Sequence, residues 1–119
     1  MSSHVHSYLR THRREWALTQ KELALLLGRA SSTYISRIEQ GKRAPSTDIV
    51  LACEVLFAVS PKEMFPKLYS HNEEAVMARA AKFFASLEKE TDHAAMRKKE
   101  LLALVLKRAI TRINNGKGV

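Results

Sequence analysis

Helix start and stop signals follow one another at short intervals in the first half of this chain, and they constrain its fold more than any other feature. Thr19 and Glu22 form a T-x-x-E capping box, which predicts the start of a helix. Gly28 provides a stop, because glycine readily adopts the left-handed backbone conformation that ends many helices. Ser31 and Gly41 bound the next helix in the same way. The sequence therefore predicts short helices joined by tight turns.

The same kinds of signal, together with apolar residues at helical spacing, predict helices along the whole chain. Ser60, Pro61 and Glu63 mark one further start, and the segment SHNEE opens a long helix at Ser70 or Asn72. We expect seven helices, over about residues 5–15, 19–27, 31–40, 49–57, 60–69, 72–90 and 94–113, with the segment NNG ending the last one. No strand pattern is present. The predicted fold class is all-α, with five short helices followed by two long ones.

The charge of the chain favours an anionic partner. The formal net charge is +8 at pH 7, and nucleic acid is a common partner of a basic domain. No apolar run approaches the roughly 18 residues that span a bilayer, and the N-terminal segment lacks the apolar centre of a signal peptide. The single cysteine, Cys53, lies in the apolar run IVLACEVL and is expected to be a buried free thiol. We therefore expect a cytoplasmic protein with no membrane association.

The helix expected over residues 31–40 separates apolar and polar side chains on opposite faces. At about 100° per residue, Ile35 and Ile38 fall on one side. The other side carries Thr33, Ser36, Arg37 and Gln40, with Ser32 at its N-terminal flank. Small side chains let a helix backbone approach DNA closely, and arginine binds guanine bidentately in the major groove. The alternative is an ordinary solvated face, but such faces usually carry long Lys and Glu side chains, and Ser and Thr are weak helix formers.

Four short features occur in this chain in a characteristic order. They are LTQKELA, a glycine after the second helix, ISRIEQGKRAP and VSPKEMF. In this order they resemble the lambda-repressor-like (XRE-type, Cro-repressor-type) helix-turn-helix family of bacterial and phage regulators, over about residues 5–69. The resemblance implies a five-helix DNA-binding domain over residues 1–69, whose third helix enters the major groove. It also implies a sequence-specific transcriptional regulator that binds double-stranded DNA, and we expect a repressor.

The family pattern implies DNA contacts at eight positions of this chain. The base-reading positions are Ser32, Thr33, Ser36 and Arg37, and the phosphate-binding positions are Gln20, Gln40, Lys42 and Arg43. Among them, Arg37 is the residue that we most expect to contact a base directly. The resemblance further implies that Arg13 pairs with Glu39 in a structural contact.

Two positions depart from the family pattern. The segment between Gly28 and Ile35 has one residue more than the commonest spacing, so the turn is longer. Ala17 replaces the usual glycine before LTQ, where a left-handed backbone would cost a residue with a Cβ about 1 kcal/mol. We expect the neighbouring Trp16 to cover this helix junction.

The last two helices carry more apolar side chains than a pair of helices can bury. The larger ones are Val76, Met77, Phe83, Phe84, Leu87, Leu101, Leu102, Leu104, Val105, Leu106, Ile110 and Ile113. Because an exposed apolar surface of this size marks an interface, we expect residues 70–119 to form a homodimer that matches an inverted-repeat operator. Two alternatives stay open. These helices fold back on the first domain, or they hold another protein, as in an antitoxin-like protein that binds DNA to regulate its own synthesis.

Motifs for catalysis, cofactors and metals are missing from the sequence. His4, His6 and His12 form the one histidine cluster, without a carboxylate or cysteine at ligand spacing. Cys53 has no suitably placed base beside it in the sequence. We therefore expect a protein that is not an enzyme and that uses no cofactor and no metal.

Overall fold

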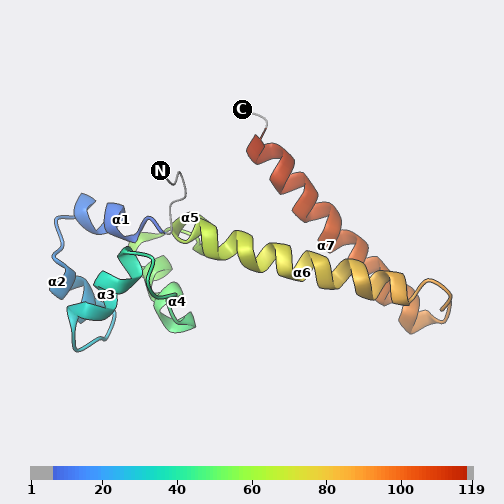
Figure 1. Ribbon diagram of the computed structural model, residues 1–119, viewed down its shortest axis with the longest axis horizontal. Helices are drawn as coiled ribbons and strands as arrows, with labels where there is room; N and C mark the ends of the chain where they lie inside the picture. The colour runs from blue at the N-terminus through green and yellow to red at the C-terminus, as the bar shows by residue number, and fades with distance from the viewer. Residues whose placement is uncertain (1–6, 118–119) are drawn as a thin grey trace. The chain divides into compact units, whose positions relative to one another are not determined.

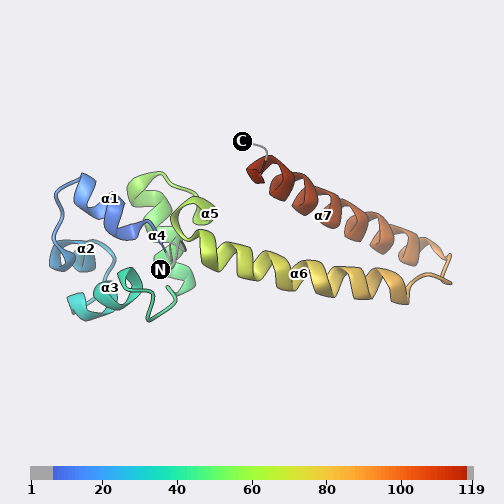
Figure 2. The same cartoon turned by 45° about the horizontal axis from the view of Figure 1, so that its top comes forward.

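The computed structural model describes residues 7–117, and among them it contains helices and no strand. Figure 1 and Figure 2 show these helices in two views. Their bounds are α1 Leu9–Glu15, α2 Gln20–Leu26, α3 Ser32–Glu39, α4 Thr47–Phe57, α5 Pro61–Met64, α6 Pro66–Ser86 and α7 His93–Lys117. The predicted all-α fold class is confirmed. The chain divides into two compact units, residues 1–70 and 71–119.

The predicted capping boxes are present at the starts of α2 and α5. The hydroxyl of Thr19 accepts a hydrogen bond from the backbone N–H of Glu22 at 3.0 Å, and the Glu22 carboxylate accepts one from the N–H of Thr19 at 2.9 Å. Ser60 and Glu63 make the same reciprocal pair before α5. Each box satisfies donors that an isolated helix end leaves unpaired, so these two starts are encoded locally.

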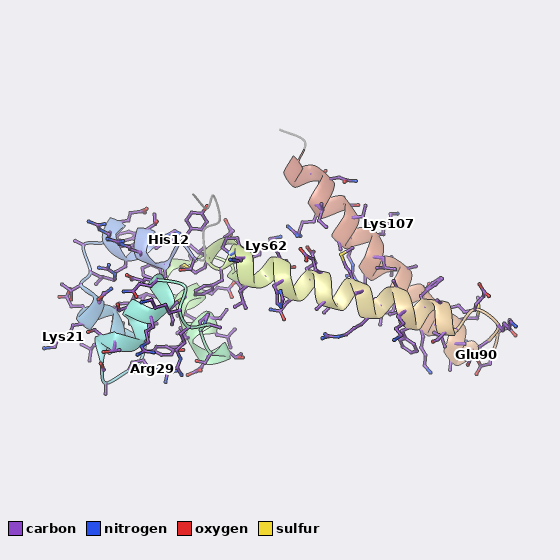
Figure 3. All side chains as sticks on the ribbon, in the orientation of Figure 1. His12, Lys21, Arg29, Lys62, Glu90 and Lys107 are labelled. Carbon is purple, nitrogen blue, oxygen red and sulfur yellow. The ribbon has the colours of Figure 1, made fainter. Side chains whose placement is uncertain are left out.

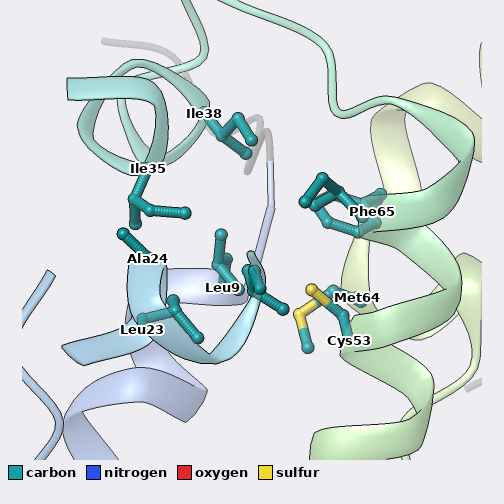
Figure 4. Packing of buried hydrophobic residues seen from close by; sticks show 10 residues of the cluster. Leu9, Leu23, Ala24, Ile35, Ile38, Cys53, Met64 and Phe65 are labelled. Atoms are coloured by element: carbon teal, nitrogen blue, oxygen red, sulfur yellow. The ribbon is translucent and has the colours of Figure 1, made fainter. Parts of the chain in front are cut away.

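The core of the first unit contains one apolar cluster to which all five of its short helices contribute. Figure 4 shows side chains of this cluster pointing toward one another from several helices. The buried members are Leu9, Leu23, Ala24, Leu27, Ile35, Ile38, Ile49, Cys53, Met64 and Phe65. Cys53 is a buried free thiol, as predicted. This cluster buries the inner faces of α2 and α3, so their polar faces are directed to solvent.

The junction between α1 and α2 has the strained backbone that the sequence predicts. Ala17 has a φ of 57°, which is the left-handed region. The turn is closed by hydrogen bonds from the N–H of Ala17 to the carbonyl of Arg14 and from the N–H of Leu18 to the carbonyl of Arg13, both at 3.0 Å. The expectation that Trp16 covers this junction is wrong, because its side chain is 65% exposed. Backbone hydrogen bonds hold the turn instead.

Several predicted helix bounds are wrong. The first helix begins at Leu9 in the described residues, and the part predicted at residues 5 and 6 lies outside them. The sixth begins at Pro66, because proline suits the first turn of a helix and Ser70 and Asn72 are tolerated inside one. It also ends at Ser86, four residues before its predicted end.

The last helix differs from its prediction at both ends. The carboxylate of Asp92 accepts the N–H of Ala95 at 3.3 Å, and α7 begins at the intervening His93. Its helical backbone runs through the NNG segment to Lys117. A glycine costs a helix only about 1 kcal/mol relative to alanine, so one glycine near an exposed end does not stop it.

Within the second unit, α7 pairs with the part of α6 that follows residue 70. The buried residues of α7 are Ala95, Leu102 and Ala109, spaced seven residues apart as in the seam of a coiled coil. Leu102 packs with Ala80 of α6 and with Leu87, which follows the end of α6. Arg112 of α7 forms an ion pair with Glu73 of α6. The seam is narrow because several of its residues are alanines.

Candidate nucleic-acid interface

The turn between α2 and α3 accommodates the extra residue through backbone hydrogen bonds. The N–H of Gly28 donates to the carbonyl of Leu25 at 3.2 Å, and the N–H of Arg29 donates to the carbonyl of Ala24 at 2.8 Å. Gly28 has a φ of 75°, a conformation that favours glycine. The hydroxyl of Ser31 then accepts the N–H of Thr33 at 3.1 Å and starts α3. The longer turn is therefore closed on both sides.

The polar face of α3 forms one depression with the start of α2 and the turn after α3. The residues that line it are Gln20, Ser32, Thr33, Ser36, Arg37, Gln40 and Lys42. These are seven of the eight positions at which the sequence predicts DNA contacts. The opposite side of α3 is buried through Ile35 and Ile38, as its helical spacing predicts.

The depression carries uncompensated positive charge. Arg37 and Lys42 are exposed, and neither forms an ion pair with a carboxylate among the described residues. The one acidic side chain of α3, Glu39, is only 3% exposed and is neutralised by Arg13. A surface with two free cations and no free acid attracts an anion such as a phosphate.

Two glutamines of the depression have fixed side chains. Nε2 of Gln20 donates to Oε1 of Glu39 at 3.0 Å, and Nε2 of Gln40 donates to the hydroxyl of Ser36 at 3.0 Å. Each amide nitrogen keeps a second hydrogen for another acceptor. These contacts reduce the side-chain freedom that would otherwise be lost on binding.

Arg43, the eighth predicted position, lies against Tyr34 of α3. Its guanidinium carbon is 4.6 Å from the centre of the tyrosine ring, and that of Arg29 is 4.4 Å from the same centre. Tyr34 and Arg29 were not among the residues predicted from the sequence. No local pattern connects these two residues with Arg43, because only the folded turns bring them together.

Residues 7–117 contain no group of three or more His, Cys, Asp or Glu side chains that could hold a metal ion, and His4 and His6 lie outside them. Burial raises the pKa of the Cys53 thiol to about 11, so the thiol stays protonated at neutral pH. Across the described helices, none is long and apolar enough to cross a membrane.

The α2–turn–α3 geometry, with an apolar face inside and a small polar face outside, is that of a helix-turn-helix DNA-binding domain. A family model described as helix-turn-helix matches residues 9–64, which are the residues from the start of α1 to the end of α5. This segment belongs to the lambda-repressor-like (XRE-type) helix-turn-helix family, as the sequence predicts. The domain is that of a DNA-binding transcriptional regulator. No curated protein and no solved structure matches the chain significantly.

Proposed function

We propose that this protein is a sequence-specific repressor that binds double-stranded DNA and places α3 in the major groove. The observation that supports this most directly is the depression in which Arg37 and Lys42 lie without acidic partners. We place its action in the cytoplasm, where operator DNA is found, and we attribute its activity to binding rather than to catalysis.

We assign base contacts and phosphate contacts to different residues of the depression and of the turn that follows α3. Arg37 reaches base edges from the exposed face of α3, where its guanidinium can bind a guanine bidentately. Ser32, Thr33 and Ser36 let the helix approach closely and add shorter polar contacts. The DNA backbone phosphates are bound by Gln20, Gln40 and Lys42 of the depression and by Arg43, which lies against Tyr34. Only the contact of Arg37 is then expected to depend strongly on sequence.

A salt series tests the phosphate assignment. Duplex binding is followed by fluorescence anisotropy from low to high salt for the wild type and for Lys42→Ala. The plot of log K against log salt has a negative slope, and its magnitude decreases by about 1 for each phosphate contact that is lost. Lys42→Ala should therefore make the slope less steep by about 1 on every duplex. Lys98→Ala, at an exposed position of the second unit, is the control and should leave the slope unchanged. Equal slopes for Lys42→Ala and the wild type would contradict the assignment.

For residues 71–119 we propose homodimerisation as a four-helix bundle. The α6–α7 pair buries mainly small residues and leaves larger apolar side chains exposed, including Val76, Phe83, Phe84, Met96, Leu101, Leu104 and Ile110. An apolar groove lined by Phe84, Leu106 and Ile110 runs along the pair. A second copy would cover these side chains and would present two reading helices to an inverted repeat. The antitoxin-like alternative covers the same surface with a different protein.

A further inference from the structure

Two cationic side chains share the ring of Tyr34 at the edge of the proposed DNA surface. Arg29, which is labelled in Figure 3, comes from the turn before α3. Arg43 comes from the turn after α3. Both guanidinium carbons lie within 4.6 Å of the ring centre, which is the range of cation–π contact. The ring therefore links the two turns that flank α3.

Tyr34 itself is fixed against the start of α4. Its hydroxyl accepts the backbone N–H of Ser46 at 3.0 Å. Arg29 is tied to the same place, because its Nη2 donates to the Ser46 hydroxyl at 3.0 Å and lies 3.7 Å from a carboxylate oxygen of Asp48. The Ser46 hydroxyl in turn donates to Asp48 at 2.7 Å. Tyr34 and Arg29 are thus connected through Ser46 and Asp48 in one hydrogen-bonded network.

Arg43 and Arg29 differ in whether a carboxylate lies beside the guanidinium. Arg43 is exposed, and within the described part of the chain it has no carboxylate partner. Arg29 has Asp48 beside it. The positive charges of Arg29 and Arg43 repel each other across the Tyr34 ring. Because Asp48 already balances Arg29, an anion would reduce this repulsion most if it bound beside Arg43. The guanidinium of Arg43 is held in place with its charge available.

We propose that Tyr34 is a positioning residue for DNA backbone binding, which directs Arg43 toward a phosphate, and that Arg29 supports the ring through Ser46 and Asp48. This inference rests on the proposed function, because it requires Arg43 to contact a phosphate. In this proposal the Tyr34 ring orders the long side chain of Arg43 before DNA binds, so that less conformational entropy is lost on binding.

A double-mutant cycle tests the coupling between the ring and Arg43. Duplex affinity is measured for the wild type, Tyr34→Leu, Arg43→Gln and the double variant. Since an exposed cation–π contact corresponds to about a two- to fivefold change in a binding constant, Tyr34→Leu should weaken binding by that factor on every duplex. In the Arg43→Gln background the same change should have no further effect. Tyr34→Phe, which keeps the ring, should retain most of the affinity.

Arg29→Lys provides an independent variant should Tyr34→Leu fail to fold. It keeps the positive charge but loses the planar group over the ring, so it should also weaken binding only while Arg43 is present. Equal losses in both Arg43 backgrounds would overturn the positioning role and assign Tyr34 to stability alone. Absence of duplex binding by the wild type would overturn the proposed function and this inference together. If the wild type binds duplex DNA but the effects of Tyr34 and Arg43 substitutions are independent, this inference would be overturned and the proposed function would stand.

Discussion

Arg13 donates hydrogen bonds to both carboxylate oxygens of Glu39, from Nε to Oε2 at 2.7 Å and from Nη2 to Oε1 at 3.1 Å. A third nitrogen, Nη1, donates to the carbonyl of Leu18 at 2.8 Å. One side chain of α1 therefore connects the end of α3 with the turn that leads into α2. The contact implied by the family resemblance is present, and it also removes a negative charge from the face of α3.

Loss of this ion pair should strongly destabilise the first unit. Arg13→Ala leaves the nearly buried carboxylate of Glu39 without its charged partner, and breaking a buried pair in this way costs about 3–5 kcal/mol. The free energy of unfolding is measured by urea denaturation followed by circular dichroism. Arg97→Ala removes a pair with Glu100 in which both side chains are exposed, so the control should cost less than about 0.5 kcal/mol. Equal losses for the two variants would contradict a buried structural role for Arg13.

Replacement of Ala17 by glycine should stabilise the protein. Ala17 has a φ of 57°, where glycine has no steric penalty from a Cβ, so Ala17→Gly should raise the free energy of unfolding by about 0.5–1 kcal/mol. The same substitution at Ala81, an exposed position inside α6, should lower it by about 1 kcal/mol. Both variants are compared with the wild type by chemical denaturation. A decrease for Ala17→Gly would show that its backbone is not strained.

The contribution of Cys53 to stability should depend on pH in the alkaline range. Burial raises the thiol pKa from 9.0 to about 11, so the folded state holds the thiol proton more tightly than the unfolded state does. Stability from this group is complete below pH 9 and is lost as the pH rises from 9 to about 11. The difference in unfolding free energy between the wild type and Cys53→Ala should therefore be constant below pH 9 and shrink above it. A difference that is constant up to pH 11 would contradict the burial of the thiol.

Polar substitutions on the exposed apolar surface of the second unit should dissociate the proposed dimer. Phe83 and Leu104 are 45% and 50% exposed, and Phe83→Glu or Leu104→Glu would place a charge inside the proposed bundle. In sedimentation velocity, the wild type should have twice the 13.5 kDa mass of one chain, and both variants should be monomers. Lys98→Glu is the control and should remain dimeric. A monomeric wild type would contradict the proposal and favour another protein as the partner.

The sequence predicts the starts of α2, α3 and α5 well because their signals are local. The box at Thr19 and the cap at Ser31 bond to backbone groups two or three residues away, so they need no tertiary structure. The start of α6 and the end of α7 were predicted wrongly for a related reason. Polar residues and a single glycine permit a helix to end but do not force it, and the surrounding chain decides.

The candidate interface is predictable to the extent that it lies on one helix. The separation of Ile35 from Arg37 follows from helical spacing alone, and the family pattern adds Gln20 and Lys42 from the neighbouring segments. The cluster around Tyr34 was not predictable, because its members lie on separate turns and meet only after folding. The exposure of Trp16 was missed because the backbone closes that turn without side-chain packing.

Binding-site selection from random duplex DNA, with the wild type and Arg37→Ala in parallel, tests most directly whether the α3 face reads bases. The wild type should enrich an inverted repeat whose half-sites lie about one helical turn, or a multiple of it, apart. Arg37→Ala should enrich a related sequence that has lost its preference at one position of each half-site, with a loss of about 1–3 kcal/mol on the original site. Enrichment of the same sequence by both proteins, or of none by the wild type, would contradict base reading by this helix.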